Sequence, residues 1–197
     1  MISFLKGQLV ELEPTHLIIE VGGIGYRVNI PLSTFDAFKS QKEVQVLTHF
    51  HVKEDAQTLY GFHLPEERTV FLDLIGISGI GPSTAIGMVS AMNPHEIKSA
   101  IVAENVKQIQ SIKGIGGKTA QRVILELKDK YKKDDLISEF NQASAVSNNS
   151  LRIEALSALV NLGFAKNSAE KVIDKILQAN QENITLEQLI KQALKSA

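Results

Sequence analysis

The feature that most constrains the fold of this chain is a nine-residue repeat near its middle. Residues 77–85 (ISGIGPSTA) and 112–120 (IKGIGGKTA) align at an offset of 35 residues, and six of the nine positions are identical. Both copies lie where apolar residues recur at helical spacing. An internal repeat within helical sequence indicates that one supersecondary unit was used twice. The pattern therefore predicts two helical hairpins, each with a Gly-Ile-Gly turn.

The Gly-Ile-Gly turn is suited to bind an anion through its main chain, and it is the pattern of the helix-hairpin-helix motif. Glycine reaches left-handed conformations and leaves no side chain in the path of a ligand. Successive backbone N–H groups can then converge on one phosphate, and the following helix adds its unpaired N–H groups and the positive end of its dipole. The alternative is a pair of ordinary glycine helix caps. We expect phosphate contacts from Gly79, Gly81 and Ser83 in the first copy, and from Gly114, Gly116, Gly117, Lys118, Thr119 and Arg122 in the second.

The two copies differ in charge. Lys118 and Arg122 lie one helical turn apart in the second copy, within reach of a phosphate, whereas Ser83 and Gly87 occupy these positions in the first. We call the two Gly-Ile-Gly turns, each with the start of the helix that follows it, the first and the second clamp. The first clamp therefore depends on backbone N–H groups and the Ser83 hydroxyl, and we expect it to be the weaker one. The central isoleucine of each turn is expected to anchor its hairpin in the core. Because phosphate contacts carry no sequence information, a protein of this kind reads the shape of its DNA.

The first 64 residues have the pattern of β structure. Runs of β-branched and aliphatic residues at 2–12, 17–30, 44–50 and 57–62 are separated by turn-forming residues, and Pro31 opens a short helical stretch. Glycines at 22, 23 and 25 interrupt the second run, which suggests a bulge or a sharp bend of the kind found at barrel corners. Five or so short strands in this length favour a small closed barrel, with the OB-fold as the leading candidate.

The sequence changes character after residue 133. Residues 134–150 contain no Lys or Arg and end in a Ser/Asn-rich stretch, which predicts a flexible linker. In residues 151–197 apolar side chains recur in three groups at helical spacing, which predicts a three-helix bundle in which Gly163 ends the first helix and Thr185 caps the third. The expected fold class is multidomain α+β, with a barrel at 1–64, paired hairpins at 65–133, the linker, and the three-helix domain.

Composition narrows the possible functions. The net charge is −1, but residues 65–133 carry ten basic and seven acidic side chains, so a polyanion site is expected in that segment. There is no cysteine, which excludes disulfides and thiol chemistry. No apolar run approaches the roughly 18 residues that span a bilayer. The N-terminus has no signal-peptide pattern either, so we expect a cytoplasmic protein with no membrane partner.

Two further sites are excluded or disfavoured by the residues present. No phosphate-loop motif for ATP occurs in the sequence. His49 and His51 lie on one strand face and could bind a metal, but no clear third ligand is present, so a packing or surface role is expected. We therefore expect no cofactor and no metal.

The whole chain resembles the RuvA family, the junction-binding subunits of the bacterial RuvAB branch-migration complex. The stretches that carry the resemblance are 48–50 (THF), 53–57 (KEDAQ), 59–62 (LYGF), 79–82 (GIGP) and 114–120 (GIGGKTA). It implies an OB-fold that assembles a four-fold symmetric homotetramer, with pairing into an octamer around DNA left open. It also implies hairpin domains that each grip one arm of a four-way (Holliday) junction, and Glu54 and Asp55 as an acidic pin at the crossover. Many members carry lysine where Ser83 stands, a departure that concerns the first clamp.

The resemblance also implies protein partners. The C-terminal domain would bind and stimulate the hexameric RuvB ATPase in recombination and DNA repair, and the RuvC resolvase would be a further partner. The candidate contacts are similar to the Met-Gly-Phe turn of ubiquitin-associated (UBA) domains, and a core role for them is an equal alternative: Leu159, Leu162, Gly163 and Phe164. Since the ATPase would lie in the partner, the chain is expected to be non-catalytic.

Two other function classes remain open from the residues alone. A structure-specific nuclease or glycosylase could use the hairpins to grip DNA, with Glu54 and Asp55 as two metal ligands, although acidic residues are common on exposed turns. Magnesium-dependent cleavage would favour that class. A general single-strand binder would stack bases on aromatic side chains of the barrel, but that segment is acidic overall and the chain has no tryptophan.

Overall fold

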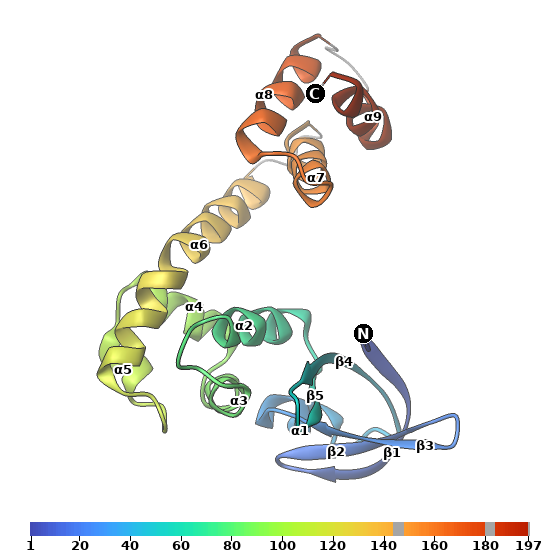
Figure 1. Ribbon diagram of the computed structural model, residues 1–197, viewed down its shortest axis with the longest axis vertical. Helices are drawn as coiled ribbons and strands as arrows, with labels where there is room; N and C mark the ends of the chain where they lie inside the picture. The colour runs from blue at the N-terminus through green and yellow to red at the C-terminus, as the bar shows by residue number, and fades with distance from the viewer. Residues whose placement is uncertain (144–147, 180–183, 197) are drawn as a thin grey trace. The chain divides into compact units, whose positions relative to one another are not determined.

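The computed structural model describes residues 1–143, 148–179 and 184–196, which fall into two compact units, Met1–Lys133 and Asp134–Ala197 (Figure 1). The first unit contains a β-barrel and a set of helices, and the second contains helices alone. None of the helices in these described ranges has the length and apolar character needed to cross a membrane.

The first unit begins with a closed five-stranded barrel in the order β1-β2-β3-β5-β4. Its strands are β1 (Phe4–Glu13), β2 (His16–Val21), β3 (Ile24–Asn29), β4 (Glu43–Val52) and β5 (Gln57–Phe62), and helix α1 (Leu32–Phe38) joins β3 to β4. Neighbouring strands are antiparallel except for β3 and β5, which are parallel. Alternate aliphatic side chains fill the interior, as the period of two in a strand requires. The predicted OB-fold is confirmed.

The glycines of the second predicted run form a turn. Gly22 and Gly23 have φ angles of +61° and +84°, and they connect β2 to β3 as a two-residue hairpin. Such hairpins favour turns with positive φ at both central residues, which glycine provides without strain. The expected bulge or bend at this point is therefore wrong, and the register shift lies in β1 between Leu9 and Glu11.

A glycine in β1 marks the corner where this strand changes partners. Gly7 pairs with Val44 of β4, and the next residue, Gln8, is the first to pair with β2, at Glu20, while it still pairs with Glu43 of β4. A Cβ atom on Gly7 would lie 2.0 Å from the main-chain oxygen of Glu20. Strands β1 and β2 therefore approach each other too closely at Gly7 for any residue with a side chain.

The helices of the first unit are α2 (Pro65–Ile75), α3 (Pro82–Ala91), α4 (Pro94–Val102), α5 (Val106–Gln110) and the start of α6 (Gly117–Ala143). Figure 1 shows α2 beside the barrel, in line with its contacts to β4 and β5. Helix α6 extends through Ala143 into the stretch for which a linker is predicted, and residues 144–147 of that stretch lie outside the described residues.

The barrel and the helices of this unit share a core. Tyr60 and Phe62 of β5 belong to the same buried cluster as the helical side chains. Their rings lie 5.2 and 5.0 Å from that of Phe71 in α2, at tilted angles that favour aromatic pairs. A polar contact reinforces the junction, because the buried Glu67 carboxylate lies 2.9 Å from Nδ1 of His63.

The second unit is a three-helix arrangement of α7 (Asn148–Asn161), α8 (Lys166–Ala179) and α9 (Leu186–Ser196), as predicted. Gly163 follows α7 with a φ of +95°, which fits its predicted role at the helix end. Thr185 caps α9, since its Oγ1 accepts from Gln188 N and the Gln188 side chain accepts from Thr185 N. A bidentate pair of Arg152 with Asp174 joins α7 to α8 at 2.5 and 2.9 Å.

Candidate nucleic-acid interface

The two hairpins of the repeat have the same backbone. Gly79 and Gly114 have φ angles of +94° and +92°, a region that glycine enters easily. The following isoleucine N–H closes each turn, at 3.0 Å from Ile80 to the Ile77 oxygen and 3.1 Å from Ile115 to the Ile112 oxygen. Ile80 and Ile115 are 5% and 6% exposed, so both are anchored in the core as predicted. The prediction that one helical hairpin occurs twice is confirmed.

The main-chain N–H groups in front of α3 and α6 are left open. Among the described hydrogen bonds outside helices and strands, none is donated by the N–H of Gly79, Gly81, Gly114 or Gly116. The first N–H groups of each following helix also lack intrahelical partners. These donors can therefore converge on an external anion at each turn.

The fold does not require glycine at the second glycine position of each turn. Gly81 has an ordinary φ of −88°, and a Cβ on Gly81 or Gly116 would meet no atom within 4 Å. Neither strain nor packing therefore requires glycine at these two positions. A close approach of a ligand to the main chain does require it.

The side chains near the turns divide into free and engaged groups. Lys118 and Thr119 lie in the first turn of α6, and the exposed Lys118 amine has no ion pair or hydrogen bond among the described interactions. Lys113 in the second turn is also exposed and has no described partner. It is not among the phosphate-binding residues predicted from the sequence, although its position next to Gly114 could have indicated it. Arg122 is engaged, because it pairs with Glu126 and with the Ser78 carbonyl.

The Ser83 side chain is exposed near the start of α3. Burial raises the pKa of Tyr60 of the barrel, and an interaction with the Ser83 side chain partly opposes this rise. The first clamp therefore has a hydroxyl where the second has the Lys118 amine, and any grip on a phosphate would come mainly from its main chain.

The proposed pin residues lie on the loop between β4 and β5. Glu54 and Asp55 are exposed at its tip, which is closed by the Lys53 N–H bonded to the Ala56 oxygen at 2.8 Å. Both carboxylates therefore project from the barrel into solvent, where they can repel phosphate.

The histidine pair of β4 lies against the shared core. The rings of His49 and His51 are 5.9 Å apart, and their Nε2 atoms are buried without a hydrogen-bond partner among the described residues. Burial, and next the nearby His51, lower the pKa of His49. No group of three or more His, Cys, Asp or Glu in the described part of the chain could hold a metal ion.

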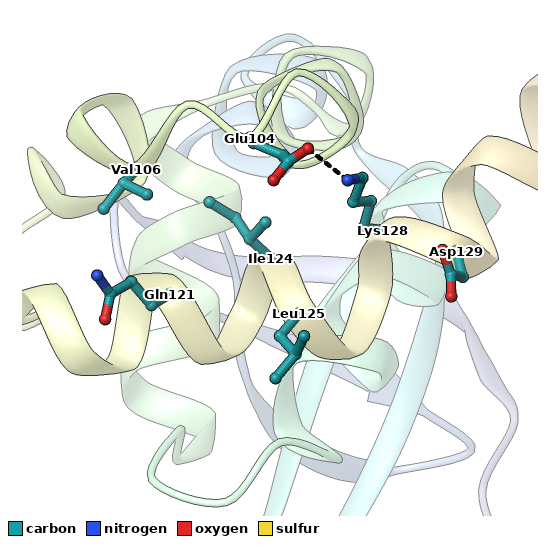
Figure 2. Close-up of a pocket in the computed structure, with 7 residues that line it drawn as sticks. All are labelled: Glu104, Val106, Gln121, Ile124, Leu125, Lys128 and Asp129. Atoms are coloured by element: carbon teal, nitrogen blue, oxygen red, sulfur yellow. Dashed lines mark hydrogen bonds and ion pairs between the residues drawn. The ribbon is translucent and has the colours of Figure 1, made fainter.

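A surface pocket of about 350 Å³ lies beside α6 (Figure 2). Glu104 and Lys128 form an ion pair at its wall, which lowers the pKa of Glu104 and raises that of Lys128. None of the predicted phosphate-binding residues is among the lining residues, which are Glu104, Val106, Gln121, Ile124, Leu125, Lys128 and Asp129. The pocket is thus distinct from the two clamps.

The candidate partner contacts of the second unit separate in the structure. Leu159 is 1% exposed and belongs to the core of the three helices, so the core alternative applies to it. Leu162 is 60% exposed, Gly163 is exposed beside it, and Phe164 is half-buried against the core. A partner contact through this turn is therefore available to Leu162 and to the edge of Phe164.

We predict that Gly116→Ala separates DNA binding from folding. The methyl group meets no protein atom, so the free energy of unfolding should change by less than about 1 kcal/mol. It occupies the open space before α6, so affinity for DNA should fall at least about tenfold, the worth of one lost charge-assisted hydrogen bond. Thermal melting and fluorescence anisotropy measure the two effects. Gly87→Ala within α3, which also meets no atom, is the control and should bind DNA normally.

A closed barrel joined to two matched glycine turns between helices defines a tandem helix-hairpin-helix protein with an OB-fold. Residues 1–61 match the family described as RuvA N terminal domain, residues 71–129 the SAM-like Helix-hairpin-helix tandem, and residues 150–197 RuvA, C-terminal domain. The chain belongs to the RuvA family.

Relatives match over their whole length. The Holliday junction branch migration complex subunit RuvA of Cytophaga hutchinsonii is 54% identical over 197 residues, which cover 99% of either chain. The protein of the same name from Christiangramia forsetii is 49% identical over 99% of either chain. The one from Vibrio parahaemolyticus is 40% identical over 100% of this chain and 99% of its own. The three matched families and the barrel therefore agree with the resemblance read from the sequence.

Proposed function

We propose that this chain binds four-way DNA junctions by their shape and acts as the non-catalytic subunit of a branch-migration complex. The observation that carries the proposal is the pair of matched turns whose N–H groups have no partner among the described hydrogen bonds, with glycines at 81 and 116 where the fold does not require glycine. Two such clamps in one compact unit would contact a DNA backbone at two points without reading bases.

The arrangement of charge supports a junction as the ligand. Residues 65–133 carry a modest excess of three positive charges, whereas the barrel segment is acidic and bears Glu54 and Asp55 at a loop tip. A homotetramer would repeat the clamps four times around a centre of four acidic tips, which matches a four-armed substrate. Two such tetramers could also pair into an octamer around the DNA.

We further propose that the second unit recruits and stimulates the RuvB ATPase, with RuvC as an additional partner. The relatives are named as subunits of a complex, which supports a protein partner for this chain. The exposed Leu162 in the turn after α7 is the apolar group best placed for that contact. We expect the protein to act in DNA recombination and repair, and to be located in the cytoplasm.

The test is a competition between a synthetic four-way junction, linear duplex and single strand, at matched salt with magnesium present. We expect strong preference for the junction and no cleavage. Equal affinity for duplex would contradict shape recognition. Cleavage that depends on magnesium would favour a nuclease, and tighter binding of single strands would favour a barrel-based binder.

Neutralising the loop tip should relax discrimination. In the double variant Glu54→Gln and Asp55→Asn, loss of two carboxylates removes repulsion of phosphate, so junction affinity stays equal or rises. Duplex affinity should rise more, and the ratio of the two dissociation constants reports the change. Lys53→Gln, on the same exposed loop, changes charge in the opposite direction and is the control. An unchanged ratio in the double variant would return Glu54 and Asp55 to the role of ordinary turn residues.

A further inference from the structure

One side chain of the second repeat reaches the main chain of the first. Nε of Arg122 in α6 donates to Oε1 of Glu126 at 2.9 Å, and its Nη1 donates to the carbonyl oxygen of Ser78 at 3.4 Å. Ser78 directly precedes Gly79, whose positive φ shapes the first turn. Arg122 therefore links the two clamps through the backbone of one of them.

Arg122 differs in this from the lysines around the second turn. Lys113 and Lys118 are exposed and have no ion pair or hydrogen bond among the described interactions, so their amines are free to neutralise a phosphate. The guanidinium group of Arg122 is held on two sides. Its planar fork suits a bridge between a carboxylate and a carbonyl, which the point charge of a lysine amine does not match.

The link has no counterpart in the other direction. Position 87, the equivalent of Arg122 in the first copy, is glycine, and the equivalent of Ser78 is Lys113. Further along α6, Tyr131 Oη donates to Asp73 of α2 at 3.1 Å. The first repeat is thus tied to α6 at two separated places, and Arg122 provides the one at the turn.

We propose that Arg122 is a positioning residue that sets the spacing of the two phosphate clamps, and that Glu126 orients its guanidinium group. The sequence predicts a phosphate contact for Arg122, because it lies one helical turn after Lys118. The positioning role replaces that expectation. Its effect on DNA rests on the proposed function, whereas its effect on the first turn does not. The two clamps must match the spacing of phosphates on one DNA backbone, so a looser first turn weakens binding without loss of a contact to DNA.

The carboxylate of Glu126 tests the proposal through the direction in which DNA affinity changes when it is neutralised. An acidic side chain near a polyanion site repels the ligand, so its neutralisation ordinarily strengthens binding. If Glu126 holds Arg122 against Ser78, Glu126→Gln weakens binding instead.

The experiment combines amide exchange of the free protein with junction binding across a range of salt. In Arg122→Gln, Arg122→Lys and Glu126→Gln, exchange of the Ile80 N–H should accelerate by roughly threefold, within the range of exposed ion pairs. The equivalent Ile115 N–H is the internal control and should not change, since each amide closes its own turn. Junction affinity should fall by a similar factor in all three variants.

The salt dependence separates positioning from phosphate contact. Arg122→Gln should leave the slope of log affinity against log salt unchanged, whereas Lys118→Ala should reduce it by about 0.9, the value for one lost phosphate contact. A reduced slope in Arg122→Gln, binding rescued by Arg122→Lys, or stronger binding by Glu126→Gln would each overturn the proposal. Unchanged Ile80 exchange would overturn it even in a chain that shows no preference for junctions, so this failure is distinct from failure of the proposed function.

Discussion

Gly7→Ala is expected to prevent the barrel from closing. A methyl group at this corner would lie 2.0 Å from the Glu20 carbonyl oxygen, and this atom belongs to the backbone of a paired strand. Relief of the overlap requires β1 to separate from β2, and the buried side chains between them would then lose their contacts. We expect a loss of at least about 4 kcal/mol in the free energy of unfolding, at the upper end for single substitutions. Circular dichroism during denaturant unfolding measures it.

Gly25→Ala is the matched control. Gly25 pairs with the same Glu20 from the opposite side, in β3, and a Cβ there would lie 3.5 Å from the Ile18 side chain, an ordinary contact. Its stability should change by less than about 1 kcal/mol, with a gain more expected than a loss because alanine restricts the unfolded chain. A Gly7→Ala protein that unfolds at the same denaturant concentration as Gly25→Ala would show that the corner can relax.

Deletion of residues 151–197 is expected to abolish stimulation of the RuvB ATPase while junction binding is retained. The buried clusters of the barrel and of the hairpins use residues up to Tyr131, and the third cluster begins at Ala155. The truncated chain therefore keeps the buried cores of the barrel and of the hairpins. Junction affinity should stay within about twofold, since the removed segment carries only one excess positive charge and no clamp residue. ATP hydrolysis by RuvB on junction DNA should fall to the rate without the chain.

Point variants in the same unit separate contact from folding. Leu162→Asp places a charge on an exposed side chain, so it should reduce stimulation and leave the melting temperature unchanged. Leu159→Ala removes a buried side chain and should destabilise the three helices by about 2–5 kcal/mol. Full stimulation by the truncated chain, or by Leu162→Asp, would rule out this unit or this turn as the motor contact.

The elements could be predicted from the sequence because their patterns are local. Strand alternation and helical spacing each depend on neighbours within one element, and so does the cap of α9 by Thr185. The two hairpins were predictable for another reason. Their repeated glycines report a backbone conformation, and φ angles of +94° and +92° at Gly79 and Gly114 show the same one twice.

The errors have physical causes that local patterns do not contain. The glycines at 22 and 23 indicate positive φ, but the pattern does not tell whether the chain then bends or reverses. Leu162 lies beyond the last residue of α7, so helical spacing does not apply to it and could not separate it from Leu159. The partner of Arg122 at Ser78 is 44 residues away, a tertiary contact that only the folded chain reveals.

The aromatic side chains that β5 contributes to the helical core have a consequence for modularity. Tyr60 and Phe62 are covalently part of the barrel, yet their rings complete the packing around Phe71. A fragment that contains the helices without the barrel would expose that surface and lack two of its largest rings. The hairpins are therefore not expected to fold without the barrel, and residues 1–133 should melt in a single cooperative transition.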